Sequence, residues 1–202
     1  MRPRTALAAV GSALLFAGGG GVAHAEDAGG GSLPVPGTAF SVSEDGDMVM
    51  ECDGVVHRFD VHGSGELRVG DRLPGDQPTF AVSTDSEQLT GYEADLGTVT
   101  VSATGPIAGE FVAASAQRPF PAAESLAQDV TVTMEHSPCR GGQPAVYASK
   151  GGFPLLNTDL TAFPQRNAVY QLTDPVELGD VTDQSAAPFT LTGFVVTVDG
   201  VS

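Results

Sequence analysis

The chain has 202 residues, of which 25 are acidic and nine are basic, with 26 glycines, two cysteines and no tryptophan. A net charge of −16 excludes nucleic acid as a partner, because phosphate binding needs clustered lysine and arginine. A hydrophobic fraction of 41% is too high for a disordered acidic tail, so the composition predicts a folded domain. A single lysine and a single isoleucine are typical of a protein from a GC-rich bacterial genome.

Residues 1–25 are predicted to be a secretory signal peptide. Arg2 and Arg4 form a positive n-region, an apolar run from Leu7 to Phe16 follows, and residues 23–25 read Ala-His-Ala, a small-x-small cleavage pattern. Four glycines directly after the apolar run make it too short for a spanning helix, so we expect no integral membrane span after cleavage. The mature protein is expected to be secreted to the extracellular space or held at the cell wall.

Residues 26–37 form a leader rich in glycine and proline, which we expect to be flexible because it has almost nothing to bury. From Thr38 onward, short runs alternate between apolar and polar residues and are separated by turn residues. The runs near 55–61, 98–103 and 130–135 carry one apolar parity each. They predict an all-β domain over residues 38–202, an antiparallel β-sandwich in which two short repeated motifs permit two similar halves.

Several segments are predicted to break or bend these strands. The Asp-Gly pair within 44–47 and the glycines within 62–65 are typical of turns, and residues 121–128 fit two turns of helix after a proline. In the last run the apolar parity shifts at Gly193, which predicts a β-bulge. The acidic segment 44–47 lacks the ligand spacing of an EF-hand, so any calcium binding there is expected to be weak.

Cys52 and Cys139 are the only cysteines, and an even number in an exported chain predicts one structural disulfide. This bond would join the two halves of the chain into one cooperative unit. The alternative is a catalytic cysteine with a free partner.

The segment that contains Cys139, Arg140, Gly141 and Gly142 is the candidate binding loop. A cysteine-anchored, glycine-rich loop with one arginine could present a rigid tip to a protein or cell-wall partner, since ordered loops often carry function. The alternative is a turn that the disulfide merely pins in place.

His57 and His136 are the candidate metal ligands. Both continue an apolar parity and lie a few residues from a cysteine, so the disulfide would bring the two imidazoles into one region. A catalytic zinc site needs three protein ligands, and Asp60 and Glu135 are expected on the opposite strand faces. We therefore expect no metal centre unless both histidines face a common third ligand, and we expect no cofactor.

No catalytic motif of the common hydrolases and no phosphate-binding loop is present, so no catalytic residue is assigned. The absence of tryptophan weakens a sugar-binding role, which relies on exposed aromatic rings. We expect a secreted or cell-envelope-associated acidic protein with a non-enzymatic binding or structural role. Two alternatives stay open: a secreted hydrolase with dispersed catalytic residues, and a weak divalent-metal-binding protein.

Overall fold

The protein is a single antiparallel sheet that closes on itself, as seen in a computed structural model that describes residues 31–105 and 107–201. The predicted signal peptide lies outside these residues. The strands are β1 (Ala39–Cys52), β2 (Val55–Leu73), β3 (Thr79–Glu93), β4 (Gly97–Ala103), β5 (Ile107–Val112), β6 (Ala122–Gln128), β7 (Val130–Ser137), β8 (Gln143–Ser149), β9 (Phe153–Leu160), β10 (Ala168–Leu172), β11 (Val176–Asp180) and β12 (Phe189–Val201), with a 3₁₀ helix η1 (Pro138–Arg140) before β8.

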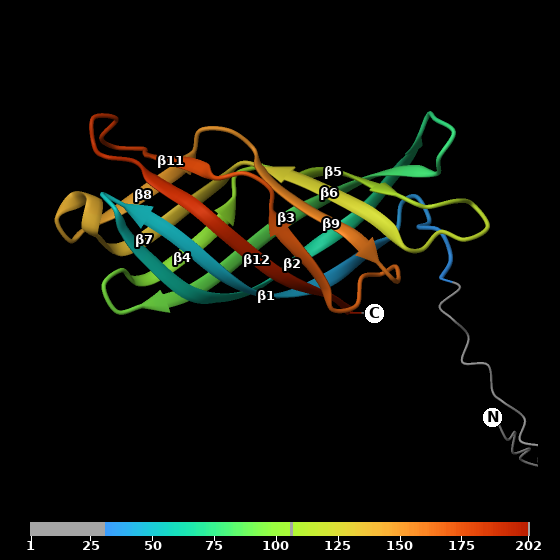
Figure 1. Cartoon of the computed structure of the whole chain (residues 1–202), viewed down its shortest axis with the longest axis horizontal. Coiled ribbons are helices and arrows are strands. Elements are labelled where there is room, and N and C mark those ends of the chain that lie inside the picture. The colour runs from blue at the N-terminus through green and yellow to red at the C-terminus, as the bar shows by residue number, and fades with distance from the viewer. Residues whose placement is uncertain (1–30, 106, 202) are drawn as a thin grey trace, which may run out of the picture.

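Four long strands, β1, β2, β3 and β12, run along the molecule, and shorter strands complete a ring at each end (Figure 1). β3 pairs with β4 through residues 88–93 and with β5 through residues 79–84. On the other side, β12 pairs with β11 through 189–191 and with β10 through 195–198. One ring therefore contains β4, β7, β8 and β11, and the other contains β5, β6, β9 and β10. We call the first ring the disulfide end, the second the far end, and the level between them the waist.

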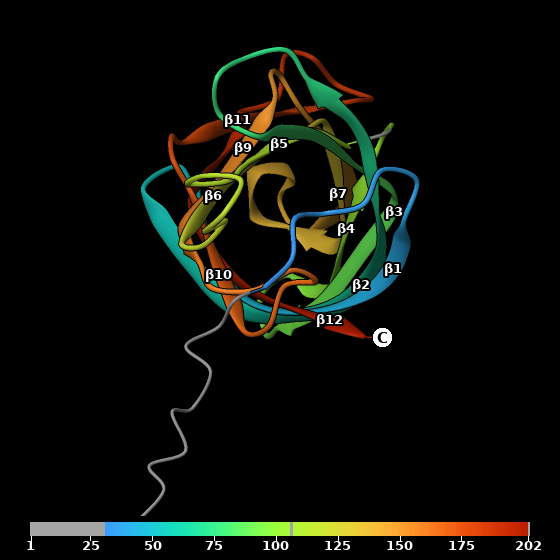
Figure 2. The same ribbon diagram turned by 90° about the vertical axis from the view of Figure 1, so that its right-hand side faces the viewer.

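The sequence-based prediction of an all-β antiparallel fold with one disulfide is confirmed. The two layers expected of a sandwich are joined at both edges, because β1 pairs with β12 and β3 pairs with β5. Seen along its length, the sheet encircles a central axis (Figure 2). The predicted bulge is also present, since the β1–β12 register shifts next to Gly193.

Three local predictions are wrong. The acidic segment 44–47 and the glycine-rich segment 62–65 were expected to turn, but they lie inside the long strands β1 and β2. Residues 122–128 form strand β6 instead of a helix. Glycine inside a strand marks a close approach of two backbones: a Cβ at Gly46 would lie 2.9 Å from the Val195 carbonyl oxygen. The glycines thus allow the long strands to coil tightly around the axis.

The interior is filled by side chains. At the far end, the ring centroid of Phe111 lies 5.4 Å from that of Phe163 and 6.1 Å from that of Phe120, both edge to face. At the disulfide end, Tyr147 packs against Phe189 with 5.0 Å between centroids. Such packing leaves room only for small internal cavities.

Residues 31–37, the last part of the predicted leader, lie against the sheet. The Gly37 N–H donates to the Val69 carbonyl at 2.8 Å, and the Leu33 side chain packs on the hydrophobic core. Within the described residues, no helix is long and apolar enough to cross a membrane.

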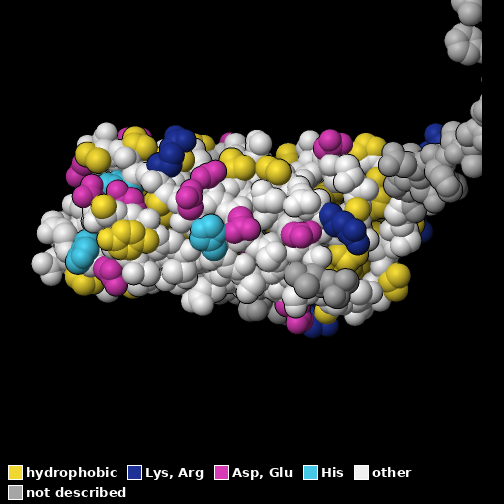
Figure 3. Space-filling model, turned by 90° about the horizontal axis from the view of Figure 1, so that it is seen from below, with side chains coloured by type: hydrophobic (Ala, Val, Ile, Leu, Met, Phe, Trp, Pro, Cys, Tyr) yellow, Lys and Arg dark blue, Asp and Glu magenta, His cyan; other side chains and the backbone are white. Residues whose placement is uncertain are grey.

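On the face that Figure 3 shows, acidic side chains do not form one continuous patch. Figure 3 shows them as separate groups along one face, with few basic side chains among them. The alternation within β1 explains this distribution, because Asp45 and Asp47 are exposed while Met48 on the other parity is fully buried. Most of the acidic side chains therefore lie on the solvent-exposed surface, and the exceptions include buried acidic side chains at the waist.

Candidate functional site

The waist holds acidic side chains inside the closed sheet. Glu44 of β1 is 7% exposed, and Glu87 of β3 lies with it on the wall of one small cavity. The cavity has a volume of about 20 Å³, which is room for one group the size of a water molecule. We call it the waist cavity. Its lining residues are Val42, Glu44, Leu67, Thr84, Glu87, Leu126, Leu155, Tyr170, Val196 and Val198.

Strand parity forces Glu44 inward. Phe40, Val42, Met48 and Met50 occupy the same parity of β1 and are all buried, so Glu44 can face solvent only if these apolar side chains do so too. The prediction of a turn at 44–47 missed this position. The signal was nevertheless present, because apolar residues continue on one parity on both sides of the glutamate.

Two glycines of β2 create the space between the two glutamates. Gly63 pairs with Glu44, and Gly65 pairs with both Val42 and Glu87, so no side chain from β2 separates β1 from β3 here. A Cβ at Gly63 would overlap the backbone carbonyl oxygen of Gln88. The segment that was expected to turn therefore lies between the two strands that carry the glutamates.

The carboxyl groups of the waist cavity have raised pKa values. Burial, followed by the charge of Glu87, raises the pKa of Glu44 to about 8. Burial also raises the pKa of Glu87, although Gln128 Nε2 donates to its carboxylate at 3.3 Å and opposes the shift. The residues lining the cavity include no lysine, arginine or histidine. Neither glutamate thus has a positively charged side chain in the cavity wall.

A third buried acid, Glu124, lies beside the cavity. Its Oε2 accepts hydrogen bonds from Gln165 Nε2 at 2.8 Å and from the Tyr170 hydroxyl at 2.9 Å. Burial raises the pKa of Glu124 to about 7 despite these two bonds. Tyr170 also lines the waist cavity, so it connects this hydrogen-bonded group to the cavity.

Some buried oxygen atoms at and beside the waist lack hydrogen-bond partners. Among the described residues there, these atoms are Glu44 Oε2, Glu124 Oε1, Gln128 Oε1 and Gln165 Oε1. An unpartnered buried polar atom costs about 1–3 kcal/mol, so such a group calls for a donor or a cation. This set is able to bind positive charge.

A second group of candidate ligands lies at the disulfide end. His57, Glu93 and Asp95 each offer one atom, and these atoms lie within 4.8 Å of one another. His57 is 4% exposed and follows the inward parity of Phe59. We call this group the mouth site. Glu93 and Asp95 were not predicted, because they meet His57 only through the pairing of β2 with β3.

The other predicted metal ligand lies elsewhere. His136 is exposed, and its backbone N–H donates to the Leu96 carbonyl at 2.9 Å. It does not belong to the group of three ligand residues found among the described residues. The hypothesis that His57 and His136 share a metal stays untested.

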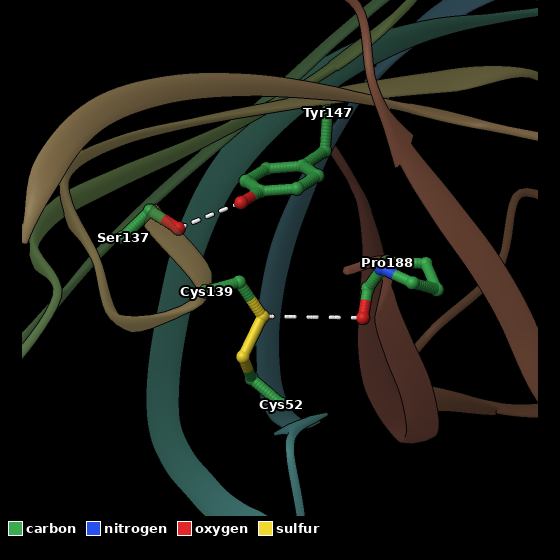
Figure 4. The surroundings of a disulfide bond; sticks show 5 residues. All are labelled: Cys52, Ser137, Cys139, Tyr147 and Pro188. Atoms are coloured by element: carbon green, nitrogen blue, oxygen red, sulfur yellow. Dashed lines mark hydrogen bonds between the residues drawn. A yellow bond between two sulfur atoms is a disulfide. The ribbon is translucent and has the colours of Figure 1, made fainter. Parts of the chain in front are cut away.

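Cys52 and Cys139 form the predicted disulfide, with 5.9 Å between their Cα atoms. The Cys139 sulfur lies 3.9 Å from the Pro188 carbonyl oxygen (Figure 4). Nearby, the buried hydroxyls of Ser137 and Tyr147 share a hydrogen bond of 2.6 Å. The bond therefore joins the end of β1 to the β7–β8 connection, next to β12.

The arginine of the candidate binding loop is held by its own chain. Arg140 Nη1 lies 3.3 Å from the Asp180 carboxylate and donates to Thr182 Oγ1 at 3.0 Å. Gly141 and Gly142 have φ angles of 62° and 82°, which favour glycine and close the turn after η1. The proposed role of Cys139–Gly142 in binding a partner stays a prediction.

A surface hollow of about 670 Å³ lies along β9 and β10. The two strands pair only at residues 155–156 and 171–172, and Asn157 Nδ2 bonds to the Val169 carbonyl at 2.9 Å beyond that point. Its lining residues include no histidine or cysteine. The hollow does not combine a nucleophile with a base of the kind used in Ser-His or Cys-His hydrolases.

One solved structure similar to this protein is that of DynF from the dynemicin biosynthesis pathway of Micromonospora chersina. The alignment covers 83% of this chain and 82% of DynF with a TM-score of 0.69 and 17% sequence identity. The two proteins share a fold. No family model and no curated protein sequence matches the chain.

Proposed function

We propose that the protein is an exported, non-enzymatic binding protein whose ligand is Ca²⁺, held in the waist cavity. The observation that carries this proposal is that two buried oxygen acceptors, Glu44 Oε2 and Gln128 Oε1, have no hydrogen-bond partner. Export is supported by the predicted signal peptide and is compatible with the disulfide.

The donor set fits a hard divalent cation. Glu44, Glu87 and Thr84 line the cavity and offer carboxylate and hydroxyl oxygens, the ligands that Ca²⁺ prefers. Gln128 does not line the cavity but donates a hydrogen bond to Glu87. Two carboxylates balance the charge of one divalent ion. The cavity volume of about 20 Å³ admits an ion but excludes an organic ligand.

The competing explanation is that protons occupy the site. With a pKa of about 8, Glu44 would hold a proton at neutral pH when no cation is present. A calcium ion would have to displace that proton, so the two explanations differ in what stabilises the fold.

The mature chain is first unfolded and refolded in the presence of a chelator, and the chelator is then removed. The test is a calcium titration of this metal-free chain. Thermal unfolding and calorimetry are followed with CaCl₂ and, separately, with KCl at equal ionic strength. A concentration of 100 times the Kd would add about 2.7 kcal/mol of stability. Glu44→Gln preserves shape and should abolish the effect.

Asp47→Asn is the matched control, since it removes a carboxylate from the same strand on the exposed face. It should leave the calcium response unchanged. Equal responses of the unmodified chain to CaCl₂ and KCl, or a full calcium response in Glu44→Gln, would refute the proposal.

A further inference from the structure

We propose that His57, Glu93 and Asp95 form a binding site for a divalent transition metal ion such as Zn²⁺. The site lies at the disulfide end and is independent of the calcium site at the waist, since it uses other residues. It also differs from the sequence-based hypothesis, because two carboxylates replace His136 as partners of His57.

The spacing of the ligand atoms matches a shared metal ion. His57 Nδ1 lies 3.7 Å from Glu93 Oε2, which is too long for a hydrogen bond. Metal–ligand distances of about 2.0–2.2 Å at tetrahedral angles place two ligands roughly 3.4 Å apart. The gap between Nδ1 and Oε2 is therefore too wide for a hydrogen bond but suits a metal ion bound to both atoms.

Backbone hydrogen bonds hold the Glu93 carboxylate in position. Its Oε2 accepts the N–H of Asp95 at 2.7 Å and the N–H of Leu96 at 2.9 Å, so the turn after β3 is folded around this side chain. The same turn brings the Asp95 carboxylate next to it. Ligating carboxylates are commonly fixed by such outer hydrogen bonds, which reduces the cost of ordering them around the ion.

His57 is buried and held in one orientation. Its side chain is 4% exposed, and Nε2 has no hydrogen-bond partner. The ring centroids of His57 and Phe189 lie 6.4 Å apart in an edge-to-face arrangement, which fixes the orientation of the imidazole. Coordination would use Nδ1, which lies 3.7 Å from Glu93 Oε2, and an imidazole already held in position costs less to order around an ion.

The donor set selects the class of metal. One imidazole nitrogen with two carboxylate oxygens suits Zn²⁺, Co²⁺ and Ni²⁺, whereas Ca²⁺ prefers oxygen ligands alone. Asp95 is exposed, so water can complete the coordination from the solvent side. The site would bind the ion with three protein ligands and leave at least one position open.

The test uses the mature, disulfide-bonded chain without a histidine tag, in excess CaCl₂ so that the waist is saturated. Co²⁺ is added and its visible d–d absorption is recorded, and Zn²⁺ binding is measured by calorimetry and by displacement of Co²⁺. We expect one Co²⁺ per chain, displaced by Zn²⁺. Asp95 is exposed, so the Asp95→Asn variant should fold normally. It should weaken Co²⁺ binding by at least tenfold.

His57→Asn should abolish the Co²⁺ band, and His136→Asn and His62→Asn are matched controls because both histidines are exposed. These controls should bind like the unmodified chain. The proposal is overturned if the unmodified chain gives no Co²⁺ band at millimolar metal. It is also overturned if the band survives in both His57→Asn and Asp95→Asn, or disappears in His136→Asn alone.

Discussion

The waist holds Glu44 of β1 and Glu87 of β3, and the mouth site holds Glu93 at the end of β3, but these acids are positioned by different means. At the waist, strand parity forces Glu44 into the interior, and burial raises its pKa to about 8. At the mouth, Glu93 is placed by a turn whose backbone N–H groups bind its carboxylate. The position of an acidic side chain can thus be determined by the hydrophobic core around it, as for Glu44, or by backbone N–H groups that bind its carboxylate, as for Glu93.

The largest expected effect on stability concerns the disulfide end, where the mouth site lies. The double variant Cys52→Ser, Cys139→Ser should lower the free energy of unfolding by about 4–5 kcal/mol, because the bond closes a loop of 87 residues. Denaturant unfolding measures this loss. Hydrogen exchange should become faster at the start of β2 and in β7 and β8, while the waist amides stay protected. Equal loosening of both regions would remove the distinction between them.

The next effect tests the waist through pH. Because folding raises the Glu124 pKa from 4.5 to about 7, its contribution to stability is fully present below pH 4.5 and is lost as the pH rises to about 7. The loss amounts to about 3 kcal/mol. Glu124→Gln should flatten the decline of the unfolding free energy across this window. Glu44 should still cause some decline up to about pH 8.

Denaturant unfolding at pH 4.5, 5.5, 6.5 and 7.5 provides the measurement for Glu124→Gln. Glu110→Gln is the control, since Glu110 is exposed on the neighbouring strand β5. Parallel pH curves for Glu124→Gln and the unmodified chain would show that burial at the waist does not raise the pKa of this acid.

The smallest effect concerns the close approach of β2 and β3 at Gly63. Gly63→Ala should lower stability by about 1–3 kcal/mol, because its Cβ would press on the backbone of β3. Gly151→Ala is the control, since nothing lies within 4 Å of the added Cβ, and it should change stability by less than about 0.5 kcal/mol. Thermal unfolding separates the two. A harmless Gly63→Ala would mean that the close approach of β2 and β3 is not required.

Local patterns predicted the parts of the fold that local physics controls. Alternation in β7 and the bulge at Gly193 follow from the pleat of a strand, and Cys52 and Cys139 had only each other as partners. The prediction of a turn at 62–65 was wrong because glycine permits two kinds of structure: turns, and close contact between coiled strands. Sequence alone does not distinguish these uses before the sheet is closed.

The candidate sites illustrate the same limit. Glu44 could have been found, because Phe40 and Met48 continue its parity on both sides. The mouth site could not, because His57 and Glu93 are 36 positions apart and meet only through the register of β2 with β3. Long-range register is determined by closure of the whole sheet, and no short motif records it.

The pairing of β1 with β12 has a consequence for biogenesis. These are the first and last strands of the part of the chain that the structure describes, and residues 41–51 pair with residues 190–201. Neither ring can close until β12 has been synthesised, since β12 belongs to both rings. The sheet therefore closes only after β12 is available, and we expect slow folding dominated by contacts between residues distant in sequence.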